Sequence, residues 1–284
     1  MFGKRFDAEV DTGAPGLVIP MTYLSDIDLG PPTGVQGSIK YGIPAQQINY
    51  YNVYYMPVVY DNGVVTASIP VGVIYKVEYR DSPNNPYEVI DPSEWPEYSV
   101  DSDMGVGVGK DTGGLASPVL ALPRDLRQGL LIDMSPSEMS ITFGTNPLPK
   151  VTSIPGWYYT TLGYEVSYQD KSSGFQVVDG TAIIDSGGLG GEVQRADLPP
   201  TIGAQRQTLP VGTVISVYTQ DKTLLYTTKV TEEEPGVQAT YIADFSYLNT
   251  GIAPFRQGPI YFEYTPPGQE NPYGGTVIFD YAPK

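Results

Sequence analysis

The sequence predicts an all-β protein built as two lobes, and three observations lead to this prediction. The first is composition: the 284 residues include 32 glycines, 27 prolines and 23 tyrosines, and only 17% are charged. This mixture suits short strands joined by Gly and Pro turns better than it suits helices. The second is a series of strand-turn-strand patterns, and the third is a set of features that recurs in each half of the chain.

Apolar and aromatic runs separated by turn residues predict most of the chain to be strand. Residues 48–60 and 64–79 are rich in Val, Ile and Tyr, and Asp61-Asn62-Gly63 lies between them. Asn-Gly flanked by such runs is a strong hairpin signal. Residues 211–230 repeat the pattern around a predicted turn at 220–222, and residues 260–264 read as a further strand.

Helical periodicity is limited to two short segments. We expect one short helix within residues 117–131, started by Pro118 and ended by Gly129, and a second one after Ser135. Residues 81–97 are rich in proline and acidic side chains, so we expect a surface loop there.

Each half of the sequence contains four features in the same order, which predicts a duplicated lobe. An apolar run ending on an Asp turn comes first, and a Gly-containing apolar segment follows later. An Arg-Gln-Gly step and a Phe-containing strand complete the set. In chain order, the last three features are at residues 104–107, 127–129 and 141–143, and again at 251–253, 256–258 and 277–279.

Prolines at 147, 149 and 155 interrupt the strand patterns, so we place the boundary between Thr145 and Pro155. We therefore predict an N-terminal lobe of residues 1–150, which carries Asp11, and a C-terminal lobe of residues 151–284, which carries Asp185.

Composition also excludes several kinds of chemistry. The chain contains no cysteine and no histidine. A zinc site and the Ser-His-Asp and Cys-His mechanisms are therefore not expected, which leaves Asp, Glu, Tyr and Lys for acid–base work. We expect no cofactor and no metal. The net charge of −16 argues against nucleic acid as a partner. The sequence contains no run of about 18 apolar residues, so we expect no membrane-spanning helix.

Two short triads carry the functional signal. Asp11-Thr12-Gly13 and Asp185-Ser186-Gly187 each follow a strand-like apolar run, one in each half of the chain. Two carboxylates on two equivalent glycine turns are what a hydrolase needs to share one proton between an acid and a base. A third copy, Asp111-Thr112-Gly113, follows no apolar strand and lies too close to Asp185 to leave room for a lobe, so we interpret it as a turn.

Together these motifs make the sequence resemble the pepsin-like aspartic proteases over nearly its whole length. Residues 6–20 and 181–187 resemble the two catalytic strand-turn segments, and residues 38–42 resemble the start of the flap hairpin. Residues 104–107 resemble the strand that supports the first Asp. Within that family, the Asp-Thr-Gly-Ala form and the cysteine-free lobes are most similar to the C-terminal aspartic protease domain of certain mycobacterial PE-PGRS surface proteins.

The resemblance implies a bilobal pepsin-like fold with a cleft and an aspartic endopeptidase activity on polypeptides. Asp11 and Asp185 would be the catalytic dyad that activates a water. Thr12 and Ser186 would bond across the lobe interface, and the glycines at 13 and 187 would admit the substrate backbone. Ordinary turn formation explains the same four residues without catalysis. The resemblance further implies a monomer at the cell surface or secreted from the cell.

Some positions depart from the family pattern. Ala14 and Gly188 stand where pepsins carry a hydroxyl that bonds the outer oxygen of each Asp, so we expect a pH optimum less acidic than that of pepsin. Val18 replaces a tryptophan that usually anchors the flap tyrosine. Tyr41 matches that tyrosine, but it is equally well explained as a strand or core residue.

The altered flap leaves an alternative function open, a catalytically silent pepsin-fold module for surface interaction or antigen display. A glycosidase with two carboxylates is a weaker alternative, because such enzymes need no paired Asp-Thr/Ser-Gly turns.

Overall fold

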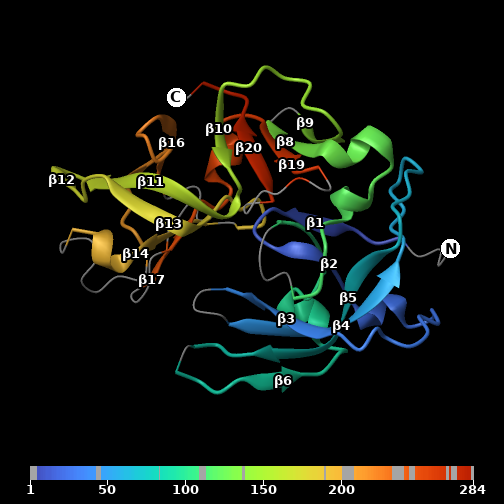
Figure 1. Cartoon of the computed structure of the whole chain (residues 1–284). Coiled ribbons are helices and arrows are strands. Elements are labelled where there is room, and N and C mark those ends of the chain that lie inside the picture. Colours follow the sequence, from blue (N-terminus) through green and yellow to red (C-terminus); the bar gives the residue numbers. More distant parts are fainter. Residues whose placement is uncertain are drawn as a thin grey trace. The chain divides into compact units, whose positions relative to one another are not determined.

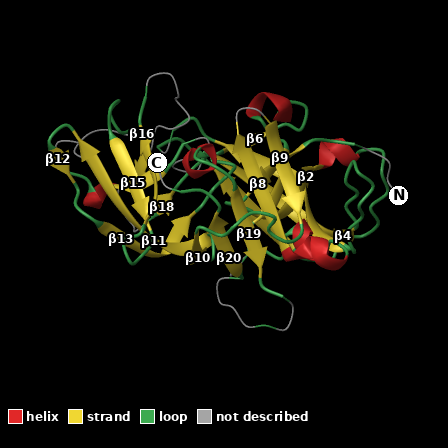
Figure 2. Ribbon diagram, turned by 90° about the horizontal axis from the view of Figure 1, so that it is seen from above, coloured by secondary structure: helices red, strands yellow, loops and turns green. Residues whose placement is uncertain are grey.

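A computed structural model of the chain consists almost entirely of strands and their connections (Figures 1 and 2). It describes residues 5–42, 46–82, 84–108, 113–135, 138–188, 190–199, 208–231, 240–242, 247–266, 269 and 274–282. The longest helical element among these residues is a 3-10 turn of 5 residues. The predicted all-β class is therefore confirmed, and the architecture is consistent with a bilobal pepsin-like fold. No helix in the described ranges has the length and apolarity to cross a bilayer.

The chain divides into two compact units, residues 1–124 and 125–284. This division falls earlier than the boundary we expected between Thr145 and Pro155. The cause is strand pairing, because β8 (Gly129–Ser135) pairs with β19 (Ile260–Tyr264) and with β9 (Glu138–Phe143). The assignment of the two lobes to residues 1–150 and 151–284 stays a prediction.

The first unit is built on one seven-stranded sheet in the order β1-β7-β2-β5-β4-β3, with β6 paired to β5. Its strands are β1 (Ala8–Asp11), β2 (Pro15–Pro20), β3 (Gln36–Tyr41), β4 (Gln47–Met56), β5 (Ile69–Tyr79), β6 (Glu88–Ile90) and β7 (Ser102–Val106). Short 3-10 turns occur at η1 (Met21–Leu24), η2 (Trp95–Tyr98) and η3 (Pro118–Ala121).

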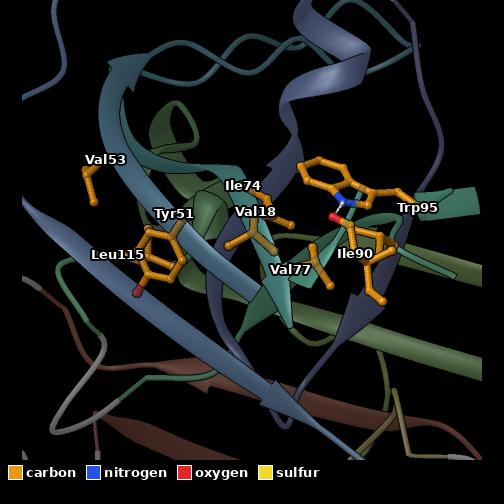
Figure 3. Packing of buried hydrophobic residues seen from close by; sticks show 9 residues of the cluster. Val18, Tyr51, Val53, Ile74, Val77, Ile90, Trp95 and Leu115 are labelled. Atoms are coloured by element: carbon orange, nitrogen blue, oxygen red, sulfur yellow. Dashed lines mark hydrogen bonds between the residues drawn. The ribbon is translucent and has the colours of Figure 1, made fainter. Parts of the chain in front are cut away.

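A cluster of apolar side chains forms the core of the first unit (Figure 3). Trp95 is 1% exposed, and its indole N–H donates to the carbonyl oxygen of Ile90 at 3.3 Å. This contact corrects the expectation that residues 81–97 are a surface loop, because they contain β6, the first three residues of η2 and a large core side chain. The buried members of the cluster are Val18, Tyr51, Val53, Ile74, Val77, Ile90, Trp95, Val100 and Leu115.

The second unit contains two sheets. The five-stranded sheet has the order β10-β20-β19-β8-β9, and the eight-stranded sheet has the order β16-β15-β11-β13-β18-β14-β17, with β12 paired to β11. The strands not yet bounded are β10 (Thr152–Pro155), β11 (Tyr158–Tyr168), β12 (Lys171–Ser172), β13 (Gln176–Ile183), β14 (Glu192–Gln194), β15 (Val214–Tyr218), β16 (Leu224–Lys229), β17 (Thr240–Ile242), β18 (Leu248–Asn249) and β20 (Gly275–Phe279). The 3-10 turns are η4 (Arg124–Gln128), which begins at the unit boundary, η5 (Arg195–Asp197) and η7 (Ala253–Arg256).

The predicted hairpins are confirmed, although their strands are shorter than expected. Strands β4 and β5 pair antiparallel, and a single bridge between Val59 and Val65 continues the pairing toward the predicted turn. Strands β15 and β16 also pair antiparallel around the second predicted turn. The strand expected at 260–264 is β19.

Both helix predictions need correction. Residues 117–131 form the two 3-10 turns η3 and η4, and Gly129 begins strand β8 rather than only ending a helix. Where the second helix was expected after Ser135, residues 138–143 form strand β9, which pairs antiparallel with β8 and has Glu138 opposite Ser135. The reason is the apolar run at 130–132, which pairs with β9 and β19 and is buried as strand.

Candidate active site

The first triad lies where β1 ends and turns into β2. The backbone N–H of Gly13 donates to Asp11 Oδ1 at 2.6 Å, which holds the half-buried carboxylate on the turn. Thr12 is fully buried within the turn. Both strands that flank the triad pair with β7, β1 in parallel and β2 antiparallel, so the turn is fixed from two sides.

Gly105 allows the first triad turn to lie close against β7. It pairs with Asp11 in the β1–β7 register and with Gly16 in the β2–β7 register. A Cβ atom at this position would lie 2.6 Å from the carbonyl oxygens of both Ala14 and Gly16. Any side chain here would therefore displace the backbone of the turn that carries Asp11.

The second triad follows β13, and three N–H donors hold its carboxylate. The backbone N–H groups of Gly187 and Gly188 donate to Asp185 Oδ1 at 3.0 and 2.9 Å. The side-chain amide of Asn249 donates to Asp185 Oδ2 at 2.6 Å. Asp185 is only 8% exposed, so these donors act on a largely desolvated carboxylate.

Asn249 supplies a donor to Asp185 at a place where the sequence led us to expect none. Gly188 lacks the hydroxyl that pepsins carry, and a Cβ atom on Gly188 would lie 2.7 Å from Asp185 Oδ2. The amide of Asn249 reaches that same oxygen from β18. Its own carbonyl oxygen accepts the N–H of Gly251 at 2.7 Å, which orients the amide group toward Asp185.

A third carboxyl group, that of Glu192, lies beside the second triad. Glu192 pairs with Asn249 in the antiparallel β14–β18 register, so their side chains share one face of the sheet. The Glu192 side chain is 5% exposed. Burial, together with the nearby negative charge of Asp185, raises the pKa of Glu192 to about 8. Glu192 is therefore mostly protonated and neutral at pH 7.

The two triads have the same local architecture, as the predicted duplication requires. In the first unit β1 pairs in parallel with β7, which in turn pairs antiparallel with β2. In the second unit β13 pairs in parallel with β18, which pairs antiparallel with β14. A Cβ atom added to Gly251 would lie 2.6 Å from the carbonyl carbon of Gly190, much as one added to Gly105 would lie 2.6 Å from the carbonyl oxygen of Gly16. The sequence repeat is therefore matched by a repeat in strand pairing.

Tyr41 is the last residue of β3, and its hydroxyl donates to Asp103 Oδ2 at 2.9 Å. Burial raises the pKa of the Tyr41 hydroxyl well above its usual value, with Asp103 as the next cause and Asp11 and Glu9 as smaller ones. The bond to Asp103 places the Tyr41 hydroxyl near the first triad, because Gly105, two residues later in β7, pairs with Asp11. Val18, which stands at the expected tryptophan position, lies in the hydrophobic core of the first unit.

The structure thus places the predicted site residues in two groups. Asp11, Thr12, Gly13 and Tyr41 belong to the first unit, and Asp185, Ser186 and Gly187 to the second. The pairing of Asp11 with Asp185, and the cross-interface bonds of Thr12 and Ser186, stay predictions. Residues 43–44, which directly follow the predicted start of the flap hairpin at 38–42, lie outside the described residues, as do Asp111 and Thr112 of the third triad copy. Within the described part of the chain, no three or more acidic side chains are grouped to hold a metal ion.

Sequence reasoning missed Asn249 and Glu192. Asn249 precedes by two residues the Gly251 segment that the sequence repeat identified, and this spacing was the available signal. Glu192 lies 7 residues after Asp185, and the equivalent position 7 residues after Asp11 is Val18. Because that position is apolar in the first half, the sequence repeat did not point to a buried carboxyl in the second half.

Comparison with known proteins agrees with this architecture. Residues 2–271 match the model of the PE-PGRS C-terminal aspartyl peptidase-like domain. The chain belongs to this family. Over 294 residues it is 32% identical to PE cleavage protein A of Mycobacterium tuberculosis, an alignment that covers 96% of this chain and 47% of the relative. It is also 32% identical over 291 residues to PE cleavage protein A of Mycobacterium marinum, covering 95% of this chain and 47% of that protein.

The chain therefore spans about half the length of the curated relatives it matches. The family description and the names of these relatives suggest protease activity.

Proposed function

We propose that the chain is an aspartic endopeptidase in which Asp11 and Asp185 share one proton and activate a water. The observation that carries this proposal is the equivalent construction of the two triads. In each, the Asp stands at or just after the end of a strand, β1 for Asp11 and β13 for Asp185. The N–H of the glycine two residues later donates to its Oδ1, at 2.6 Å for Gly13 and 3.0 Å for Gly187. Membership of an aspartyl peptidase-like family supports the same conclusion.

The chemistry follows from two carboxyl groups that hold one proton between them. The ionised group takes a proton from the water, and the resulting hydroxide attacks the carbonyl carbon of a peptide bond. The protonated group donates to the carbonyl oxygen, which gives a tetrahedral intermediate. Proton transfer to the amide nitrogen then allows the C–N bond to break. Because the two groups titrate as a coupled pair, their ionisation steps belong to the pair.

The test is cleavage of a peptide library by the wild type and by Asp11→Asn and Asp185→Asn variants. Each substitution keeps the size of the side chain and removes its acid–base function, so we expect kcat/KM to fall by about 100-fold or more. Asp28→Asn is a matched control, because Asp28 Oδ1 also accepts the N–H of the glycine two residues later, at 2.9 Å, on an exposed loop. This control should cleave like the wild type.

The alternative is a catalytically silent module with the same fold. No cleavage by the folded wild type, or equal cleavage by the wild type and both active-site variants, would refute the proposed dyad and favour that alternative.

A further inference from the structure

Tyr41 is held by a buried side chain from a different part of the first unit. Its hydroxyl donates to Asp103 Oδ2 at 2.9 Å, across 62 residues of sequence. Asp103 is 7% exposed and is the second residue of β7. The contact therefore joins the end of the β3 strand to an inner strand of the sheet.

Among the described strands β3 pairs only with β4, and just beyond its end the backbone N–H of Gln46 donates to the carbonyl oxygen of Tyr41 at 2.9 Å. None of the six residues of β3 is buried, and they alternate between exposed and half-buried. Gly42, which follows Tyr41, is exposed and has a left-handed φ of +78°. The ladder with β4 fixes the register of the strand, in which Tyr41 pairs with Gln47. A side-chain tether near the tip would then restrict how far this hairpin moves.

The sheet register places Asp103 next to both the core and the first triad. Asp103 pairs with Val18 in the antiparallel β2–β7 register and with Glu9 in the parallel β1–β7 register. Two residues later in β7, Gly105 pairs with Asp11. Val18 is an apolar core residue that offers no hydrogen-bonding group, whereas its cross-strand neighbour Asp103 offers a carboxylate.

We propose that Asp103 is a positioning residue that anchors the Tyr41 end of the β3–β4 hairpin beside Asp11. Its role in catalysis rests on the proposed endopeptidase function, because an anchored hairpin would hold a substrate in line with the reacting groups. The tether itself does not depend on that function.

The pH behaviour of the pair fits an anchor. The pKa of Tyr41 is raised above its usual range, so its hydroxyl keeps the proton that it donates to Asp103 across the whole range in which a protease would work. Asp103, Asp11 and Glu9 are the charged groups that contribute to this shift, and all three favour the neutral hydroxyl. The hydrogen bond from Tyr41 to Asp103 is therefore kept at every pH at which the tyrosine stays protonated.

The first part of the test is independent of activity. In protein labelled with 13C-tyrosine, Tyr41→Phe identifies the Tyr41 signal. We expect that signal to move at pH 7 in Asp103→Ala and to stay in place in Asp101→Ala. Asp101 is a matched control, because its Oδ1 accepts the hydroxyl of Tyr23 at 2.5 Å in the same unit. An unmoved Tyr41 signal in Asp103→Ala would refute the tether.

The second part measures kcat and KM on a cleaved peptide. We expect Asp103→Ala and Tyr41→Phe each to lower kcat/KM by about 10-fold or more, since each removes a hydrogen bond to a charged group. The double variant should be no worse than either single one. Asp103→Asn, which keeps an acceptor oxygen, should recover most of the activity, and Asp101→Ala should match the wild type.

Additive losses in the double variant, or wild-type activity in Tyr41→Phe, would overturn the positioning role. Tyr41→Phe removes only one hydroxyl, so it decides the matter even when Asp103→Ala does not fold. If the wild type cleaves no peptide, the proposed function fails, while the 13C signal still decides whether the tether exists.

Discussion

Asn249 is the side chain whose removal should most directly test how Asp185 is held. Its amide donates to Asp185 Oδ2 at 2.6 Å, and its carbonyl oxygen accepts the N–H of Gly251 at 2.7 Å. Asn249 is 9% exposed, so solvent is poorly placed to replace either bond. Asn249→Ala therefore leaves one oxygen of the Asp185 carboxylate without this donor, although the backbone N–H groups still bind the other oxygen.

The expected size of the effect follows from the kind of bond. A hydrogen bond to a charged group contributes about 1.5–3 kcal/mol. If that stabilisation is lost where Asp185 acts, kcat/KM should fall by about 10- to 150-fold. Asn249→Asp should be at least as damaging, because an ionised carboxylate at this position presents an acceptor and a second negative charge to Asp185.

The assay is steady-state cleavage of one peptide, together with a thermal unfolding curve for each variant. Asn146→Ala is the matched control, because Asn146 donates to both carboxylate oxygens of Asp280 at 3.1 and 2.9 Å in the same unit. We expect that control to lose stability but to keep the kcat/KM of the wild type at a temperature where the variant is fully folded. Equal kcat/KM for Asn249→Ala and the wild type would refute the reasoning.

Three further predictions concern the same two sites. Gly105→Ala puts a Cβ atom 2.6 Å from two backbone oxygens of the first triad turn, so we expect a loss of about 1–3 kcal/mol in unfolding free energy and a loss of cleavage. Gly63→Ala, at a φ of +80° in open space, should cost about 1–2 kcal/mol and leave cleavage intact; the same outcome for both variants would contradict the packing argument. Gly188→Ala brings a Cβ atom to 2.7 Å from Asp185 Oδ2, so it should lower kcat clearly while changing the melting temperature little. An unchanged kcat would count against a fixed carboxylate. Because the pKa of Glu192 is raised from 4.5 to about 8 by folding, its contribution to stability is complete below about pH 4.5 and is lost as pH rises through about 8. That loss is on the order of a few kcal/mol in the unfolding free energy measured with denaturant. Glu192→Gln should flatten the plot of unfolding free energy against pH between about 4.5 and 8. An unchanged slope would show that Glu192 is not buried as a neutral acid.

Much of the fold could be predicted from the sequence because its signals are local. The Asn62-Gly63 turn between two Val-, Ile- and Tyr-rich runs specifies a hairpin through residues that are adjacent in the chain. The two helix predictions were wrong for the opposite reason. Pro118 does begin a helical turn, but the residues after Gly129 take their structure from pairing with β19, more than a hundred residues away.

The candidate site shows the same limit. Each Asp-x-Gly triad is a local signal, and the turn and its Asp–Gly hydrogen bond depend on three consecutive residues. Asn249 and Asp103 could not be found this way, because their contacts with Asp185 and Tyr41 are set by strand register. Only the pairing of β18 with β13, and of β7 with β1, brings these side chains to the triads.

The central claim is that Asp11 and Asp185 work on one water, and a crystal structure that resolves bound water tests it most directly. We expect one water to lie within hydrogen-bond distance, about 2.6–3.2 Å, of a carboxylate oxygen from each residue. Carboxylates that share no water and point to separate surfaces would contradict the proposed dyad, whatever the two triads have in common.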